Sequence, residues 1–246
     1  MSLKGKTAII TGGGTGIGRA TALRLAEKGV NIVVNYSRSE QEAQATLEEI
    51  KALGVNGFVF RANVAEEGEI EAMVEETIKT FGQIDILVNN AGTTDFVELD
   101  DLAGLRSEHW DRAFSVNTKG VFMVSRACAD HLKKSKGAIV NITSIAGLTG
   151  AGSSIAYAAS KAAAISVTKS LARVLAPDVR VNAIAPGIVM TRWVEGKEDH
   201  VERLSAGTPL GRASTPEDIA EVALGLVENA GFVTGQTIVV DGGFTL

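Results

Sequence analysis

Two side chains that can exchange and steer a proton, Tyr157 and Lys161, lie four residues apart, and Ser144 precedes them by thirteen residues. Residues four apart share one face of a helix, so a phenol and an ammonium would lie side by side. The positive charge favours the phenolate, and we expect it to lower the tyrosine pKa from about 10 toward the working pH. Such a phenol can exchange a proton with an alcohol or ketone, while the serine hydroxyl holds the same oxygen. The pattern Y-x-x-x-K is short, and alone it also fits the surface of an amphipathic helix.

The elements that would position these residues alternate along the whole chain. Short Val- and Ile-rich runs predict parallel strands buried on both faces, at residues 7–11, 31–36, 57–61, 84–89, 138–143, 180–185 and 237–240. Longer patterns predict helices at residues 16–28, 40–53, 66–81, 107–134, 155–175 and 215–228. Gly29 and Gly54 are typical helix C-terminal stops, and Ser39 and Ser107 are expected N-caps. The sequence therefore predicts one α/β domain, residues 1–246, with a doubly wound parallel seven-stranded sheet and helices on both faces.

The composition is that of a globular, acidic chain, with 45% hydrophobic residues, 22% charged residues and a net charge of −5. That charge argues against a nucleic-acid or anionic membrane partner, and no apolar run is long enough to span a bilayer. Cys128 has no second cysteine to pair with, which suits a reducing cytoplasm, and we expect it in the core. His109, His131 and His200 lack the spacing of paired ligands, so no metal is expected.

A glycine-rich loop, TGGGTGIG at residues 11–18, follows the first predicted strand. Glycines allow a tight turn and a close approach to a pyrophosphate, and the following helix N-terminus offers N–H groups and a positive dipole. The spacing of Gly12, Gly16 and Gly18 differs from G-x-G-x-x-G, and alone the loop also fits a plain turn. The strand before it and the helix after it predict a nucleotide site.

The end of the second predicted strand bears on the choice of nucleotide. An NAD site often has an acidic residue here that accepts from the ribose 2′-hydroxyl, and none occurs before Glu40. Ser37 and Arg38 could instead donate to a 2′-phosphate, although Arg38 could also be a solvated residue ahead of a helix. We therefore expect NADP(H). NAD stays open, because Thr15 in the glycine loop adds no second positive charge.

Together these residues resemble the short-chain dehydrogenase/reductase family over nearly the whole chain. The resemblance rests on motifs in the family's order: the glycine loop, NNAG at residues 89–92, Asn117 in NTKG, Ser144, the Tyr157–Lys161 pair, and Pro186-Gly187 with Thr191 beyond. It implies catalytic roles for Asn117, Ser144, Tyr157 and Lys161. It implies cofactor contacts from Gly12, Gly14, Thr15, Gly16, Ile17, Gly18, Tyr36, Ser37, Arg38, Asn63, Val64, Asn90, Ala91, Gly92, Tyr157, Lys161, Pro186, Gly187, Val189 and Thr191. Asn63 stands where the family commonly has aspartate, and its amide can still contact adenine.

The resemblance also implies a mechanism, in which hydride passes between a nicotinamide and a carbonyl carbon. Tyr157 would donate or accept the proton on oxygen, and Lys161 would lower the pKa of that phenol and bind the nicotinamide ribose. Ser144 would hold the substrate oxygen, and Asn117 would support a water relay to Lys161. Relatives are commonly homotetramers built from helices 107–134 and 155–175, with the C-terminal strand as a second contact.

A non-catalytic nucleotide-binding protein on the same fold is the alternative of another class. Such a protein would be expected to lack Tyr157, Lys161 or Ser144, and all three are present. The sequence therefore favours an enzyme.

Two substrate classes fit the resemblance. Many relatives are 3-oxoacyl-acyl-carrier-protein reductases, and an acidic carrier could bind the scattered basic residues Arg126, Lys133, Lys134, Lys136 and Arg173. Lysines near a helix C-terminus are also favoured by the helix dipole, so they do not require a carrier.

The other class is a small free ketone, alcohol or sugar. The loop after Gly92 carries four acidic residues against Arg106 and would repel an acidic carrier, namely Asp95, Glu98, Asp100 and Asp101. Trp193, Val194 and Leu204 could close an apolar lid over a small substrate. On these grounds the sequence favours the small carbonyl or alcohol.

Overall fold

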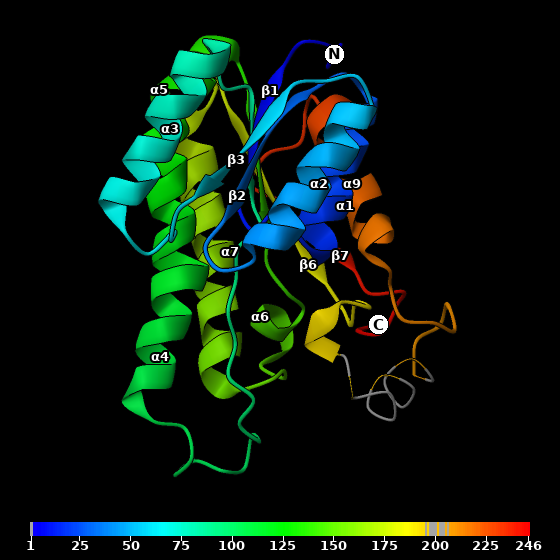
Figure 1. Cartoon of the computed structure of the whole chain (residues 1–246). Helices are drawn as coiled ribbons and strands as arrows, with labels where there is room; N and C mark the ends of the chain where they lie inside the picture. Colours follow the sequence, from blue (N-terminus) through cyan, green and yellow to red (C-terminus); the bar gives the residue numbers. More distant parts are fainter. Residues whose placement is uncertain (1, 195, 197–200, 202–204, 206) are drawn as a thin grey trace.

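The computed structural model describes the chain except for residues 1, 195, 197–200, 202–204 and 206 (Figure 1). Within the described residues, seven parallel strands form one sheet in the order β3-β2-β1-β4-β5-β6-β7. The strands are β1 Thr7–Ile10, β2 Asn31–Tyr36, β3 Gly57–Arg61, β4 Ile86–Asn89, β5 Ala138–Ile142, β6 Arg180–Pro186 and β7 Thr237–Val240. The predicted seven-stranded doubly wound fold is confirmed.

Helices cover both faces of this sheet, as Figure 1 shows. They are α1 Gly16–Glu27, α2 Glu40–Ala52, α3 Glu67–Phe81, α4 Ser107–Phe114, α5 Val121–Ser135, α6 Ala146–Thr149, α7 Ile155–Leu175 and α9 Pro216–Glu228. Two further segments, η1 Ser115–Gly120 and η2 Arg192–Val194, are a π-helix and a 3₁₀-helix. Of the described helices, none is long and apolar enough to cross a membrane.

The strands are mostly apolar because successive side chains point to opposite faces and both faces are covered. In β1, Ala8 and Ile10 pack with α1, α2 and α9 in one core, whereas Ile9 packs with α3, α5 and α7 in the other. In β2, Ile32 and Val33 divide in the same way between the two cores. This two-sided burial fixes the register, because a slip by one residue would exchange the two apolar sets.

The long helix predicted at residues 107–134 is divided by a feature that the periodicity did not indicate. Residues 115–120 widen into the π-helix η1, which joins α4 to α5 without a break. The predicted N-cap Ser107 is wrong, because Ser107 is the first helical residue and Arg106 is the N-cap. At that end the backbone N–H of Arg106 donates to Nδ1 of His109 at 3.1 Å. The predicted stops Gly29 and Gly54 do follow α1 and α2 and have φ of 81°.

Candidate active site

The predicted site residues gather at the carboxyl edge of the sheet. The strand order reverses between β1 and β4, which are adjacent although the chain passes through β2 and β3 between them. In open parallel sheets the ligand crevice opens beyond the strand ends at such a reversal. The glycine loop leaves β1 and the NNAG segment leaves β4 at this point, so both border one crevice region.

The glycine loop adopts a conformation that side chains would prevent. Gly12 and Gly16 have φ of +61° and +50°, the left-handed region that favours glycine. A Cβ on Gly14 would lie 2.8 Å from the backbone of Ala43 in α2, and one on Gly18 would lie 2.3 Å from the carbonyl oxygen of Gly12. The glycines therefore bring the loop onto α2 and fold it back on itself.

The polar side chains that hold this loop include those of Asn90, Thr11 and Asn35. The amide Nδ2 of Asn90 donates to the carbonyl oxygens of Thr11 and Gly12, at 3.0 Å each. The hydroxyl of Thr11 accepts from the backbone N–H of Asn90 at 2.9 Å and of Ala91 at 3.0 Å. Asn35 of β2 accepts from the backbone N–H of Gly12 at 3.3 Å. Asn90, predicted as a cofactor contact, thus donates its amide hydrogens to the loop.

At the end of β2, one residue of the predicted cofactor site is buried and the next two are exposed. Tyr36 is buried, and burial, followed by a hydrogen bond with Glu40, raises the pKa of its phenol. Ser37 and Arg38 are exposed, which leaves them accessible to a ligand. Ser39 then precedes α2, and its side chain does not cap that helix.

Asn63 and Val64, at the end of β3, differ in how they are held. The Asn63 Oδ1 accepts from the backbone N–H of Ala65 at 3.1 Å, and its own backbone N–H donates to Glu69 at 2.7 Å. Val64 is buried, and a Cβ on Gly120 of η1 would lie 2.9 Å from its Cγ2. The side-chain Nδ2 of Asn63 is thus the atom that this geometry leaves for a contact with a base.

Tyr157 lies in the first turn of α7, where Ser154 caps the helix. The Ser154 Oγ accepts from the backbone N–H of Tyr157 at 3.2 Å. The Ser144 side chain, from the segment after β5, interacts with the Tyr157 phenol. Burial raises the phenol pKa to about 12, and the interaction with Ser144 opposes that rise. The expectation of a lowered tyrosine pKa is wrong, because desolvation of the phenolate outweighs the other influences.

Lys161 lies one turn further along α7 and is 4% exposed. Its Nζ donates to the carbonyl oxygen of Ile142, at the end of β5, at 3.0 Å. The Nζ lies 5.7 Å from the centroid of the Tyr157 ring. Burial lowers the pKa of this amine to about 8. Close packing fixes the helix here, since a Cβ on Gly147 of α6 would lie 2.6 Å from the backbone N of Ala162.

Asn117 is buried inside the π-helix η1 and bonded at both ends of its amide. Its Oδ1 accepts from the backbone N–H of Thr93 at 2.8 Å. Its Nδ2 donates to the carbonyl oxygen of Thr93 and to the hydroxyl of Ser160, at 2.9 Å each. Ser160 in turn donates to the carbonyl oxygen of Tyr157 at 2.7 Å. Asn117 therefore connects the segment after β4 to the helix that carries Tyr157.

Gly92 lies where these parts converge. A Cβ built on it would lie 3.4 Å from Asn117 Oδ1, 3.6 Å from Lys161 Nζ and 3.7 Å from Trp193 Cη2. The backbone after β4 therefore reaches the amide, the amine and the indole together. The predicted catalytic residues Asn117 and Lys161 meet around this glycine, together with Trp193, which packs on Tyr157.

The segment after β6 covers the same region. Gly187 donates to the carbonyl oxygen of Val240 at 3.0 Å, and Val189 forms an isolated parallel bridge with Ser214. Thr191 Cγ2 lies 3.2 Å from the position of a Cβ on Gly16, so this segment contacts the glycine loop.

Trp193 follows within η2 and packs edge-on against Tyr157, with the ring centroids 6.3 Å apart. The predicted lid residue Leu204 lies outside the described residues.

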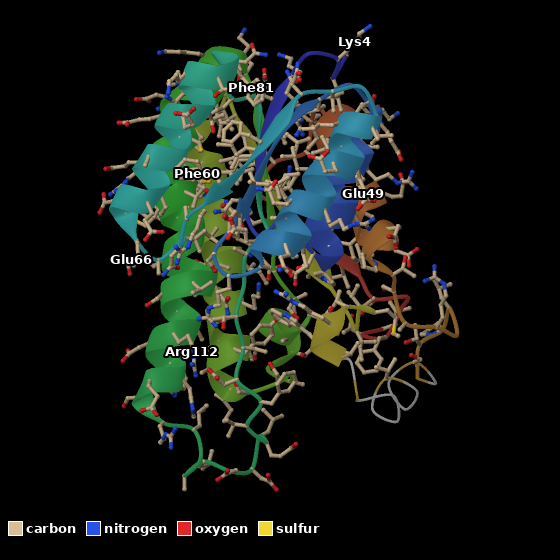
Figure 2. All side chains as sticks on the ribbon, in the orientation of Figure 1. Lys4, Glu49, Phe60, Glu66, Phe81 and Arg112 are labelled. Carbon is tan, nitrogen blue, oxygen red and sulfur yellow. The ribbon has the colours of Figure 1, made fainter. Side chains whose placement is uncertain are left out.

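The loop that carries Asp95, Glu98, Asp100 and Asp101, here called the acidic loop, contacts the segment just before the helix of Tyr157. The hydroxyls of Thr94 and Ser153 are hydrogen-bonded, and the Val97 backbone N–H donates to the Ser153 carbonyl oxygen at 2.9 Å. Asp95 pairs with Arg112, labelled on α4 in Figure 2, through a 3.0 Å Nε–Oδ2 contact. The remaining acidic residues of the loop, Glu98, Asp100 and Asp101, are exposed.

Some residues that shape the site were not singled out from the sequence. Asn35 and Thr11 hold the glycine loop, and Ser160 and Thr93 hold Asn117. Asn35 had a usable signal, because a polar residue inside an apolar strand run must find partners when buried. Arg192, which reaches α2, had none in the sequence. In the described part of the chain, no group of three or more His, Cys, Asp or Glu side chains could hold a metal ion.

Comparisons with known proteins match this architecture over almost its full length. A family model described as enoyl-(acyl carrier protein) reductase matches residues 12–245. A 3-oxoacyl-[acyl-carrier-protein] reductase of Staphylococcus aureus is 42% identical over 242 residues, 97% of each chain. One from Synechocystis is 39% identical over 249 residues, covering 100% of this chain and 99% of the relative. A crystal structure from Burkholderia xenovorans, described as a short-chain dehydrogenase/reductase, superimposes with a TM-score of 0.92 at 35% identity, covering 97% of each chain.

Proposed function

The chain belongs to the short-chain dehydrogenase/reductase family and is an oxidoreductase of keto and CH–OH groups, and from this premise we propose that it is an NADP(H)-dependent carbonyl reductase with Tyr157 as its proton donor. The observation that carries the proposal is the interaction between the Ser144 hydroxyl, from the segment after β5, and the Tyr157 phenol of α7. Those two groups can hold and protonate one substrate oxygen.

The proton chemistry follows from the two pKa values. With a pKa of about 12, the Tyr157 phenol stays protonated at neutral pH and is ready to donate to the oxygen of a ketone under reduction. Lys161, with a pKa of about 8, is still mostly an ammonium at pH 7. Once the phenol has given up its proton, the ammonium 5.7 Å from the ring stabilises the phenolate. Ser144 keeps the substrate oxygen in line with the phenol.

Asn117 acts in this proposal through its neighbours. It holds Thr93 and Ser160 at once, so it keeps the β4 segment against the helix that carries Tyr157 and Lys161. The backbone at Gly92, close to both Asn117 and Lys161, has no side chain to fill the space beside the amine. That space suits the water relay to Lys161 expected from the family.

The residues of the crevice fit a dinucleotide. A Cβ at Gly14 or Gly18 would collide with the backbone of Ala43 or Gly12, so only glycine permits this tight loop ahead of α1, whose N-terminus can receive a pyrophosphate. The exposed Ser37 and Arg38 at the end of β2 can donate to a 2′-phosphate. When bound, the nicotinamide supplies or accepts the hydride. We expect Thr191, which lies against the glycine loop at Gly16, to hold its carboxamide.

For the substrate we propose first a 3-oxoacyl thioester, because the relatives from Staphylococcus aureus and Synechocystis are named 3-oxoacyl-[acyl-carrier-protein] reductases. Exposed apolar side chains next to the crevice could contact an acyl chain, namely Phe96, Leu99, Leu148 and Met190. Their presence on the segments that border Tyr157 supports an apolar substituent on the ketone.

A small free ketone or alcohol is the second candidate, and the acidic loop favours it. Glu98, Asp100 and Asp101 would repel an acidic carrier at the entrance. In addition, Arg126, one of the basic residues considered for carrier binding, is paired with Glu67. The two candidates differ in whether the carrier protein itself contributes to binding.

The test follows loss of the nicotinamide absorbance with three matched substrates: a 3-oxoacyl group on acyl carrier protein, the same group on N-acetylcysteamine, and a free ketone of similar length. We expect NADPH to be consumed with at least one of them. A carrier-borne substrate with the higher kcat/KM supports the first candidate, and a carrier that gives no advantage supports the second. No consumption of NADPH or NADH with any of them, or with a wider ketone panel, would contradict the proposal.

We further propose a homotetramer in the cytoplasm. Exposed aromatic or apolar side chains lie on the elements expected to pair: Trp110 on α4, Phe122 on α5, Val174 on α7, and Val239 on β7. The buried, unpaired Cys128 suits a reducing compartment. Sedimentation at equilibrium tests the assembly, and a monomer at micromolar concentration would contradict it.

A further inference from the structure

Arg192 joins the segment after β6 to the start of α2, and we propose that it is a specificity residue that contacts the 2′-phosphate of NADP(H). The inference rests on the proposed cofactor and adds to it a further cation, from a part of the chain far from Arg38. The observation behind it is a hydrogen bond from Arg192 Nη1 to Ser39 Oγ at 2.9 Å, between residues 153 positions apart.

Three consecutive residues make three different contacts across the crevice. Thr191 lies against Gly16 of the glycine loop, and Trp193 packs on Tyr157. Between them, Arg192 reaches Ser39 at the end of the β2 segment. The segment of Thr191 and Arg192 therefore reaches from the glycine loop to the residues that follow β2. In dinucleotide folds the adenosine ribose lies at that strand end.

The contacts that Arg192 makes within the described part of the chain do not use its full capacity. They are one neutral hydroxyl, Ser39, and one carboxylate, Glu42, at 3.9 Å. The Arg192 side chain is 50% exposed, so this ion pair stabilises the chain little. A guanidinium has five N–H donors in a fork that matches phosphate oxygens. Its remaining donors can therefore bind an anion without breaking a buried interaction.

The charge balance at the start of α2 gives Arg192 a function. Glu40 and Glu42 lie in the first turn of α2, next to Arg38. Arg61, opposite Tyr36 at the end of β3, is a second cation here, and the two carboxylates cancel the charges of Arg38 and Arg61. Arg192, which lies near Glu42, brings the local sum of these five side chains from zero to +1, and that charge favours a 2′-phosphate. The positive end of the α2 dipole then favours the anion.

The same geometry links cofactor choice to the catalytic end. A phosphate held by Arg192 would also hold the adjoining Trp193 against Tyr157, since the two residues are consecutive. Binding of the phosphorylated cofactor thus stabilises the segment that covers the phenol. An unphosphorylated cofactor leaves Arg192 with Ser39 and Glu42 alone.

The test measures dissociation constants, not turnover. NADPH and NADH are titrated by nicotinamide fluorescence, and 2′,5′-ADP and 5′-AMP by calorimetry, against wild type, Arg192→Ala and Arg192→Lys. Loss of a charge-assisted contact is expected to weaken NADPH and 2′,5′-ADP by at least about tenfold in Arg192→Ala. NADH and 5′-AMP should change by less than about twofold. Arg192→Lys should restore part of the loss, because it keeps the charge without the fork.

The control is Arg24→Ala, which removes an exposed inter-helix ion pair with Glu221, 2.7 Å long, away from the crevice. It should leave all four constants unchanged. An equal loss of NADPH and NADH affinity in Arg192→Ala, or no loss of either, overturns the inference while leaving the proposed function intact. A wild type that binds both cofactors equally overturns the proposed cofactor, and the inference falls with it.

Discussion

The nucleotide end and the catalytic end of the crevice are built from different parts of the polypeptide. At the nucleotide end the site is shaped by the backbone. The glycines of the 11–18 loop allow its tight conformation, and Asn90 and Asn35 form hydrogen bonds with main-chain atoms. At the catalytic end the site is shaped by side chains. Two of them, Tyr157 and Lys161, are ionisable groups with strongly shifted pKa values. The nucleotide end therefore depends on glycines that lack a Cβ. The catalytic end depends on ionisable groups held where burial disfavours their charged forms.

The largest effect we predict concerns the backbone end. Gly18→Ala puts a Cβ 2.3 Å from the Gly12 carbonyl oxygen and 2.5 Å from Asn90 Nδ2, so it should lower the free energy of unfolding by at least about 3 kcal/mol and abolish NADPH binding. Gly68→Ala in α3 is the matched control, because a Cβ there meets nothing within 4 Å. That change should instead stabilise the helix by about 0.5 to 1 kcal/mol. Urea denaturation measures both, and two changes of the same sign would refute the distinction.

The next effect belongs to the catalytic end and has the opposite sign. Lowering the Lys161 pKa from 10.5 to about 8 costs about 3 kcal/mol of folding free energy at neutral pH. Lys161→Met should remove that cost, lose about 1 kcal/mol through the unpaired Ile142 carbonyl, and so stabilise the protein by about 2 kcal/mol while destroying turnover.

The sign of the pH dependence follows from proton counting. Between pH 8 and 10.5 the unfolded chain holds more protons at Lys161 than the folded chain, so the stability of wild type rises across that window. The advantage of Lys161→Met should therefore be full below pH 8 and vanish toward pH 10.5. Lys169→Met, an exposed position on the same helix, is the control and should show neither effect. A Lys161→Met protein less stable than wild type at pH 7 would contradict the account.

The smallest effect concerns the residue that covers the catalytic end. Trp193→Ala removes the edge-on contact with Tyr157, an aromatic pair of the kind worth about 1 kcal/mol. We expect KM for the ketone to rise by about three- to tenfold, with NADPH affinity within about twofold of wild type. Trp193→Phe should recover most of the loss. A rise in NADPH Kd that exceeds the rise in KM would instead assign Trp193 to the nucleotide end.

The parts of the fold that could be predicted are those fixed by local pattern. The residue bounds of β2, β3 and β7 agree with the predicted runs, because each strand is a short run rich in apolar residues. The predicted strand at 84–89 begins later, at Ile86. Asp85 is used instead to pair with Lys6 at 2.7 Å and to accept from the backbone N–H of Thr7. The residue at which β4 begins therefore depends on partners that lie far away in the sequence.

The site was predictable where a motif is contiguous, and less so where distant segments meet. Tyr157 and Lys161 share a helix face, as their spacing indicated. The π-helix around Asn117 was not predicted, because it depends on hydrogen bonds to Thr93 and Ser160. The predicted direction of the Tyr157 pKa shift was wrong for a related reason. Sequence spacing indicates how near a charge lies, but it does not indicate how deeply the phenol is buried. Arg192 and Ser39 lie too far apart in sequence for any local pattern to connect them.

The central claim is that Tyr157 transfers the proton, and one comparison tests it most directly. Tyr157→Phe removes a single hydroxyl and keeps the ring that packs on Trp193. In single-turnover reduction of the best ketone, followed by nicotinamide absorbance, we predict a rate at least about 10²- to 10⁴-fold below wild type. The NADPH Kd should stay within about twofold of the wild-type value. A Tyr157→Phe protein that reduces the ketone at a rate near that of wild type would contradict the account.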